Sequence, residues 1–458
     1  MISKIIWPST FEKGNPFGGT DGIRPIRITF HSSSFTNLPN DEKKALDILM
    51  GLAMLADVDA MSFDGSVSPR IFIDYERADA ENIGLNIINA EGETNTFSGV
   101  SKLCLEPSNI EYLLGVYSSN DEEKNRSICQ EILEAKSHGA LCRDIFITSS
   151  AILLRNKDKL AELNIFSPRD ALKITGLYLR MKGEFEWISH IEGNARFITS
   201  NQAFYQFLSR GLLPCSWKYL SGLGLHDKNE ILTSLGWSVL HRYSRVLQAR
   251  DEISRLFYMP NTSSSKGQMG YHFDYLTLLL TAALDVQALI INIVYSFGMK
   301  DNDCGLRRKL FKKAIKNNPG TSNLNTLLAD KDDFIEILFD LRNKIHTVSL
   351  ETNFHTPITY PDELLERIYQ YDQKDHWGIQ KQNVTVIKNR GDPVPSIAYS
   401  VDMCNLAHGL VCEATKLINS LMEETKIEDF LDVEVLSKIS LNPPPDMLHY
   451  IQTYLLLA

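Results

Sequence analysis

The sequence lacks the cysteine and histidine patterns that mark a zinc site or a disulfide framework. Its seven cysteines are scattered and odd in number, and no two of them form a CxxC pair. The first residues also lack an apolar run long enough for a signal peptide. Such scattered cysteines are typical of reduced thiols inside cells. We therefore expect a cytoplasmic protein that uses neither a metal ion nor another cofactor.

An excess of basic residues is also missing. The chain has 47 Lys and Arg against 57 Asp and Glu, with a formal charge of -10, which argues against a protein that coats nucleic acid over its whole surface. One basic run without acids occurs at 306–316, and its cations are Arg307, Arg308, Lys309, Lys312, Lys313 and Lys316. This run predicts either a helix face that follows an RNA backbone or a solvated surface, and the sequence leaves both open.

One long apolar segment, residues 271–297, raises the choice between a membrane span and a buried helix. Its polar residues fall on one narrow helical face at about 100° per residue. They are Asp274, Thr277, Thr281, Asp285 and Asn292. Because a central Asp costs roughly 2.5–3.5 kcal/mol in a bilayer, the segment predicts a buried helix of a soluble bundle, with no membrane contact.

The order of predicted elements indicates an α+β protein of more than one domain. A chain of 458 residues is expected to form two or three domains, since a domain usually has about 100–200 residues. Predicted strands at 23–30, 70–75, 83–90, 110–117 and 144–149 alternate with helices that begin near residues 40, 121 and 168. This alternation predicts a Rossmannoid α/β domain over 1–212. A helical connector over 213–265 and an all-α bundle over 266–458, with an insertion at 352–400, are expected to follow.

The most informative helix is predicted over 331–350. Its core stripe consists of Phe334, Ile337, Leu338, Leu341, Ile345 and Val348. Arg342 and His346 lie beside this stripe, one turn apart, and Asn343 lies at the edge of the polar face. Because an unpaired buried charge is costly, these two side chains must meet an internal acid or face a groove or a partner.

The run Arg342-Asn343-Lys344-Ile345-His346 on a late helix resembles the Arg-polar-x-x-His motif of HEPN domains. The resemblance covers about 265–430, with three residues between Arg and His where that family usually has four to six. It implies a helical bundle, a homodimer and metal-independent cleavage of RNA, as in stress or phage-defence effectors. It also implies that Arg342 stabilises a phosphate, that His346 acts as acid or base, and that Asn343 orients them.

A second resemblance lies in residues 144–180, which are similar to the late strand and following helix of PIN-like nuclease domains. Asp144 and Thr148 match that pattern, but Ser149 or Ser150 stands where the family has a second acid. PIN chemistry needs several carboxylates around a divalent cation, and only Asp64 and Asp74 are candidate first-strand acids. The resemblance therefore implies a degenerate, non-catalytic PIN-like domain used for binding or assembly.

A structural interpretation of the same residues remains open. In it, Arg342 pairs with Asp274, Asp285 or another acid inside the bundle, and His346 is a hydrogen-bonded core histidine. The protein would then be a non-catalytic scaffold, in which the bundle mediates dimerisation or docking of a protein partner and the α/β domain binds a ligand or nucleic acid. His408, on the last long helix, is expected to be a packed residue more often than a member of the site.

Overall fold

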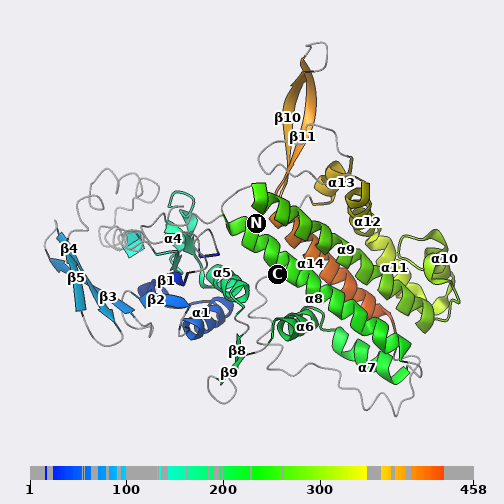
Figure 1. The fold of residues 1–458 in the computed structure, drawn as a ribbon, viewed down its shortest axis with the longest axis horizontal. Helices are drawn as coiled ribbons and strands as arrows, with labels where there is room; N and C mark the ends of the chain where they lie inside the picture. The colour runs from blue at the N-terminus through cyan, green and yellow to red at the C-terminus, as the bar shows by residue number, and fades with distance from the viewer. Residues whose placement is uncertain are drawn as a thin grey trace.

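The structure is a computed structural model of the chain. It describes residues 16–17, 24–53, 55, 57–62, 71–78, 82–89, 94–98, 131–132, 134–135, 143–160, 163–183, 186–189, 195–198, 200–226, 230–259, 263–347, 363–372, 377–387 and 393–427. The fold is mixed, with a sheet near the N-terminus and a helical C-terminal part (Figure 1). This division confirms the coarse architecture predicted from the sequence.

The N-terminal sheet has its strands in the order β5-β4-β3-β2-β1-β6-β7. Their bounds are β1 Ile26–Phe30, β2 Val58–Ser62, β3 Ile71–Ala78, β4 Asn82–Asn89, β5 Thr94–Ser98, β6 Ile145–Ile147 and β7 Ile165–Phe166. From β3 through β2, β1 and β6 to β7, each strand pairs parallel with its neighbour. Strands β4 and β5 extend the sheet beyond β3 with antiparallel pairing. Strand β1 lies in the middle of the five parallel strands, and four of its five residues are buried, as expected of a parallel strand covered on both faces.

Helices α1 (Asn40–Leu52) and α5 (Pro168–Met181) pack against each other beside this sheet, and α4 (Ala151–Arg155) follows β6. The predicted start of α5 is confirmed, because Ser167 Oγ accepts a hydrogen bond from the Asp170 amide at 3.3 Å. Helix α1 begins at residue 40 as predicted, and Pro39 at its cap position makes no side-chain cap hydrogen bond. The predicted strand 110–117 lies outside the described residues, as does most of the predicted helix 121–138.

The C-terminal part is built from long helices. Their bounds are α6 Asn201–Leu212, α7 Ser216–His226, α8 Ile231–Tyr258, α9 Ser263–Val294, α10 Lys309–Asn317, α11 Ser322–Asp330, α12 Asp332–Thr347, α13 Glu363–Tyr371 and α14 Met403–Glu424. Helices α8 and α9 pack along each other over most of their length, and α14 lies against both. Two-stranded β8 (Glu186–Ser189) and β9 (Ala195–Ile198) precede this part.

The predicted insertion between the last helices contains α13 and a β-hairpin. Strands β10 (Ile379–Ile387) and β11 (Pro393–Val401) pair antiparallel along their whole length and project from the bundle (Figure 1). The base of the hairpin is anchored by Trp377, which is buried against Gly409 of α14 and Phe334 of α12.

Helix α9 contains most of the long apolar segment 271–297, which extends three residues beyond its end. Its length and composition would suffice to cross a membrane, and it is the one helix with this property among the described residues. Within the fold, 67% of its most apolar window is buried. It packs on α8, α12 and α14, which is the behaviour of a core helix in a soluble protein.

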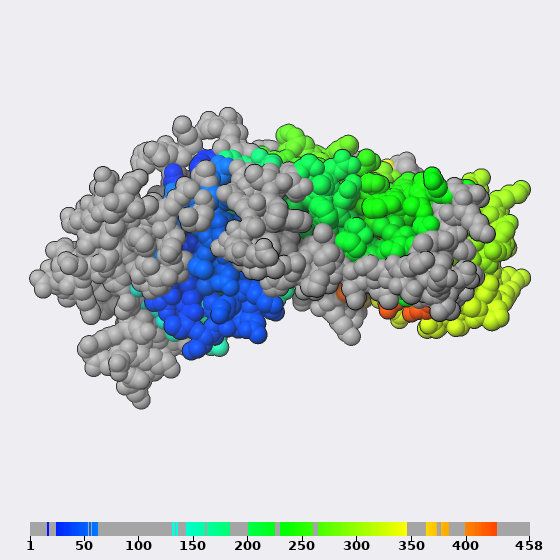
Figure 2. Space-filling view, turned by 90° about the horizontal axis from the view of Figure 1, so that it is seen from below, coloured from blue at the N-terminus to red at the C-terminus, as the bar shows by residue number. Residues whose placement is uncertain are grey.

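A buried ionic network joins the two parts. Arg180 of α5 pairs with Asp251 of α8 at 2.7 Å, and Arg250 pairs with the same carboxylate at 3.2 Å. The Tyr205 hydroxyl of α6 donates to it at 2.8 Å. Figure 1 places the N-terminal sheet at one end of the molecule and α10 and α11 at the other. In the view from below in Figure 2, the blue N-terminal residues are likewise well separated from the yellow-green residues at the opposite end.

Candidate functional site

A cleft of about 580 Å³ lies between α9, α12 and the segment that precedes α10. Most of its charged and polar lining comes from Asp285, Arg307, Arg308, Arg342 and Asn343. Two of the three residues predicted from the HEPN-like motif, Arg342 and Asn343, thus face one cavity together with two members of the predicted basic run. A concave site with convergent polar groups is the usual location of ligand binding.

Arg342 lies at the border between the core and this cleft. Four members of the predicted stripe of α12 are buried, namely Phe334, Ile337, Leu338 and Leu341. Ile345 is half-buried, and Val348 lies outside the described residues. The Arg342 guanidinium lies over the Phe339 ring, 4.8 Å from its centre, and so packs against an aromatic side chain at the edge of the core. The side chain remains 32% exposed, and its buried Nε has no hydrogen-bond partner among the described residues.

The partner of Arg342 is Asp285 of α9, with 3.5 Å between Nη1 and Oδ2. The structural interpretation had named Asp285 and Asp274 as alternatives, and the geometry selects Asp285. Burial raises the pKa of the Asp285 carboxyl, while the positive charges of Arg342 and Arg308 oppose that rise. The Asp285 side chain is 44% exposed, so the ion pair is accessible from the cleft and not enclosed in the core.

Asn343 and His346 follow Arg342 on the same helix. Asn343 is exposed and lines the cleft. His346 lies within α12, one turn after Arg342, and its side chain is outside the described residues. His408 does not line the cleft. Its Nε2 instead lies 2.9 Å from Ser254 Oγ, and desolvation by burial lowers its pKa to about 3, as expected of a packed residue.

The basic run divides into paired and exposed cations. Arg307 bridges two acids of α12, at 2.5 Å from Glu336 and 3.0 Å from Asp340. Lys312 is bound to Asp332, also of α12. The remaining cations, Arg308, Lys309, Lys313 and Lys316, are exposed. None of them forms a salt bridge in the described part of the chain, although the charge of Arg308 acts on Asp285. The run is therefore partly a clamp between α10 and α12 and partly a basic surface.

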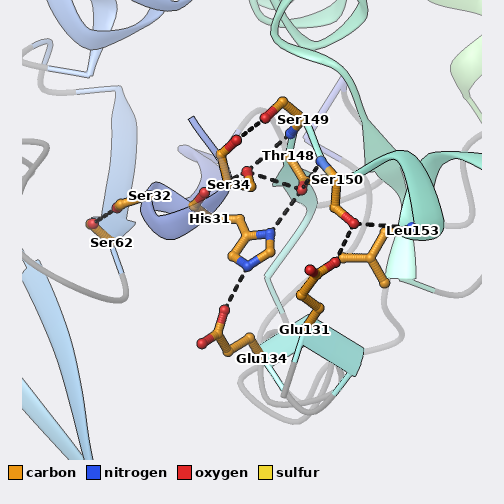
Figure 3. Close-up of polar contacts among 10 residues, drawn as sticks. All are labelled: His31, Ser32, Ser34, Ser62, Glu131, Glu134, Thr148, Ser149, Ser150 and Leu153. Atoms are coloured by element: carbon orange, nitrogen blue, oxygen red, sulfur yellow. Dashed lines mark hydrogen bonds and ion pairs between the residues drawn. The ribbon is translucent and has the colours of Figure 1, made fainter. Parts of the chain in front are cut away.

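A second polar cluster lies at the carboxyl ends of β1 and β6 (Figure 3). His31 contacts Thr148 Oγ1 through Nδ1 at 2.8 Å and Glu134 through Nε2 at 2.6 Å. Ser34 Oγ donates to the His31 carbonyl and accepts from the Ser149 amide. The cluster lies where the chain leaves β1 and β6 toward opposite sides of the sheet, which is a common ligand position in such folds.

The hydroxyls of this cluster are used within the protein. Ser150 Oγ donates to Glu131 and caps α4, and Ser32 bonds to Ser62 at the end of β2. His31, Thr148 and Glu134 are almost fully buried, so their mutual contacts offset the cost of removing polar groups from water. The sequence signal for the cluster is a run of Ser and Thr directly after each strand, HSSS after β1 and TSS after β6.

Asp144, which matches the PIN-like pattern, lies at the other end of β6. Its carboxylate accepts two hydrogen bonds from Arg24, both at 2.6 Å, and one from the Arg27 amide at 2.8 Å. Asp144 therefore fixes the residues around the start of β1 to β6. The two candidate first-strand acids of the PIN-like pattern are Asp64 and Asp74. Asp64 lies outside the described residues, and Asp74 lies in β3 with its side chain outside them.

No family model, curated protein or solved structure matches this chain. The resemblance to HEPN and PIN-like domains therefore rests on the short sequence motifs alone. Function has to be inferred from the chemistry of the cleft.

Proposed function

We propose that the helical part binds single-stranded RNA at the Arg342 cleft and cleaves it without a metal ion. The observation that carries this proposal is the convergence of Arg342, Arg308 and Asn343 on one cavity. Planar guanidinium groups match the oxygens of a phosphodiester and stay charged at any physiological pH. The exposed lysines of α10, which follow Arg308 in the chain, supply positive charge for the neighbouring phosphates.

The chemistry asked of these residues is limited, because RNA carries its own nucleophile in the 2′-hydroxyl. Arg342 stabilises the negative charge that grows on the phosphate. His346, one turn away, would provide an imidazole, the side chain whose unperturbed pKa suits proton transfer near neutrality. Asn343 orients the phosphate by donating a hydrogen bond. Two copies related by a two-fold axis would place two such sets in one shared groove.

The test is cleavage of an unstructured RNA by the purified full chain in the presence of EDTA. We expect cleavage by the unaltered protein and its loss in Arg342→Ala and in His346→Ala, with an unchanged thermal unfolding midpoint. Arg245→Ala is the matched control, since Arg245 is an exposed arginine of α8 that does not line the cleft. Cleavage that EDTA abolishes would assign the activity to a metal-dependent site and contradict the proposal.

A non-catalytic scaffold is the second candidate function, and one observation favours it. Arg342, Arg307 and Lys312 each form an ion pair that ties α12 to α9 or to the α10 region. If these pairs serve only the packing of the bundle, Arg342→Ala lowers the unfolding midpoint and leaves RNA binding as it was. That combined outcome separates the scaffold from the ribonuclease.

A further inference from the structure

Asp285 is the acid that reaches into the cleft from the bundle itself. It projects from the long helix α9, whereas Asp301, the other carboxylate in the lining, lies in an exposed 3-10 turn (Asp301–Asp303). Asp285 Oδ2 lies 3.5 Å from Arg342 Nη1. A phosphate bound by the Arg342 guanidinium would therefore lie close to the Asp285 carboxylate.

The segment before α10 closes over the same carboxylate. A Cβ added at Gly305 would lie 3.8 Å from Asp285 Oδ1 and 3.3 Å from the Arg308 side chain. Gly305 therefore lies beside both side chains, and Arg308 is near enough to Asp285 for its positive charge to oppose the rise in the pKa of that carboxyl. Arg342 from one side and Arg308 from the other thus border a carboxylate that opens to the cavity.

We infer that Asp285 is the general base of the cleavage reaction, accepting the proton of the RNA 2′-hydroxyl while Arg342 and Arg308 hold the phosphate. This inference rests on the function proposed above and adds a catalytic residue to it. From the sequence alone, Asp285 is expected only as a structural partner of Arg342. Asp285 instead gives the cleft a proton acceptor on α9, and we then assign the leaving group to His346.

The step balances without a co-reactant. The Asp285 carboxylate takes the 2′-hydroxyl proton as the 2′-oxygen forms a bond to phosphorus. The bond from phosphorus to the 5′-oxygen breaks, and His346 in its protonated form donates a proton to that oxygen. The products are a 2′,3′-cyclic phosphate and a 5′-hydroxyl. Substrate binding has to exchange the Asp285–Arg342 ion pair for a phosphate–Arg342 pair, which frees the carboxylate to accept the proton.

The electrostatics of the site suit a base. Desolvation raises the pKa of Asp285, so its carboxylate has a greater affinity for a proton than an exposed aspartate. Arg342 on α12 and Arg308 before α10 oppose this rise. The other charged residues in the lining are Asp301 and Arg307, and Arg307 is held by two acids of α12. A base with a raised pKa removes a proton more effectively than an ordinary carboxylate.

The experiment measures single-turnover cleavage of an unstructured RNA in EDTA, as a function of pH, for the full chain and for Asp285→Asn. We expect the rate of the unaltered protein to fall as the pH drops through the raised pKa of Asp285, because the base must be ionised. Asp285→Asn should lower the rate about 100-fold or more and should lack this acidic limb. Asp285→Glu should restore part of the rate.

Asp274→Asn is the matched control. Asp274 lies on the same helix, and burial raises its pKa as well, but it does not line the cleft. Its variant should cleave at the rate of the unaltered protein. Binding of an RNA analogue with 2′-deoxyribose should be retained or tightened in Asp285→Asn, since the competing carboxylate is gone. A purely structural role predicts weaker binding and a lower unfolding midpoint instead.

The possible outcomes separate the two proposals. Cleavage by Asp285→Asn within about twofold of the unaltered protein, with Arg342→Ala inactive, would overturn the base assignment and leave the ribonuclease in place. Normal RNA binding and cleavage by Arg342→Ala would overturn the proposed function, and so would the absence of any cleavage by the unaltered chain. The assignment of Asp285 would then fall with it.

Discussion

Gly409 of α14 shows how a single hydrogen atom in place of a side chain fixes a local packing. The indole of Trp377 lies against it so closely that an added Cβ would be 2.4 Å from two ring atoms. Trp377 is 3% exposed and anchors the projecting hairpin. A glycine inside a helix usually costs about 1 kcal/mol relative to alanine. Glycine is nevertheless needed at position 409, because the Trp377 ring occupies the space that a Cβ would fill.

We therefore predict that Gly409→Ala destabilises the protein. The overpacking should cost about 1–3 kcal/mol and outweigh the gain in helix propensity. Urea unfolding followed by circular dichroism gives the free energy. Gly270→Ala in α9 is the control, since nothing lies within 4 Å of its added Cβ, and it should gain roughly 0.5–1 kcal/mol. Equal stabilisation by both variants would contradict the packing argument.

At the scale of residues, sequence periodicity identified the position of Arg342 but not its partner. The spacing of the apolar residues on α12 places Arg342 beside the core, which the structure confirms. Choosing Asp285 over Asp274 requires the rotation of α9 against α12, which depends on the packing of both helices and is not encoded in either alone. The division of 306–316 into paired and exposed cations has the same origin, because it depends on which acids of α12 lie opposite.

The contribution of a single element, helix α10, to the proposed RNA binding can be tested by mutation. Its exposed lysines Lys309, Lys313 and Lys316 project to solvent, and each contact with a single-stranded backbone releases a fraction of a counterion. Changing the three to Glu should weaken RNA binding and lower the slope of log affinity against log salt by about 2. Fluorescence anisotropy at several salt concentrations measures both quantities.

The control for α10 is Lys43→Glu with Lys44→Glu, two exposed lysines of α1 in the N-terminal part. This variant also lowers the net charge but changes a surface at the other end of the molecule (Figure 1). Its salt slope should stay that of the unaltered protein. A similar loss in both variants would mean that only the overall charge matters.

At the scale of elements, the most apolar strands and the longest helices were predictable, and several shorter elements were not. The apolar strands β1 and β6 and the capped start of α5 follow from local residue patterns. Strand β2 and helix α11 were missed. Helix α11 buries only Leu324 and Leu328 along nine residues rich in Asn, Ser and Thr, so its apolar signal is weak and its position depends on α10 and α14.

The buried network of Asp251 links the two parts of the whole molecule. Burial alone raises the pKa of this carboxyl, but Arg180 and Arg250 more than offset that effect, so the pKa lies below its ordinary value. A depressed pKa contributes stability that is present above the ordinary value of 3.8 and is lost as the pH falls through the lower folded value. The contact between α5 and α8 should therefore weaken under strongly acidic conditions.

We predict that Asp251→Ala destabilises the full chain by about 3–5 kcal/mol, because it leaves two buried arginines without their carboxylate. Urea unfolding at neutral pH measures the loss. Glu252→Ala, at the next residue of α8, is the control, since its pair with Arg255 is partly exposed and should contribute about 0–1 kcal/mol. Comparable effects of the two substitutions would show that the network does not hold the parts together.

The order of the strands also has a consequence for synthesis of the protein. His31 and Thr148, at the ends of the adjacent strands β1 and β6, are 117 positions apart in the chain, whereas α8 and α9 are separated by a few residues. Contacts between distant positions form slowly, because a long loop must close first. On the ribosome, β1 to β3 therefore emerge long before β6 can join them. The nascent chain exposes apolar strand edges during this interval, which is when chaperones are most needed.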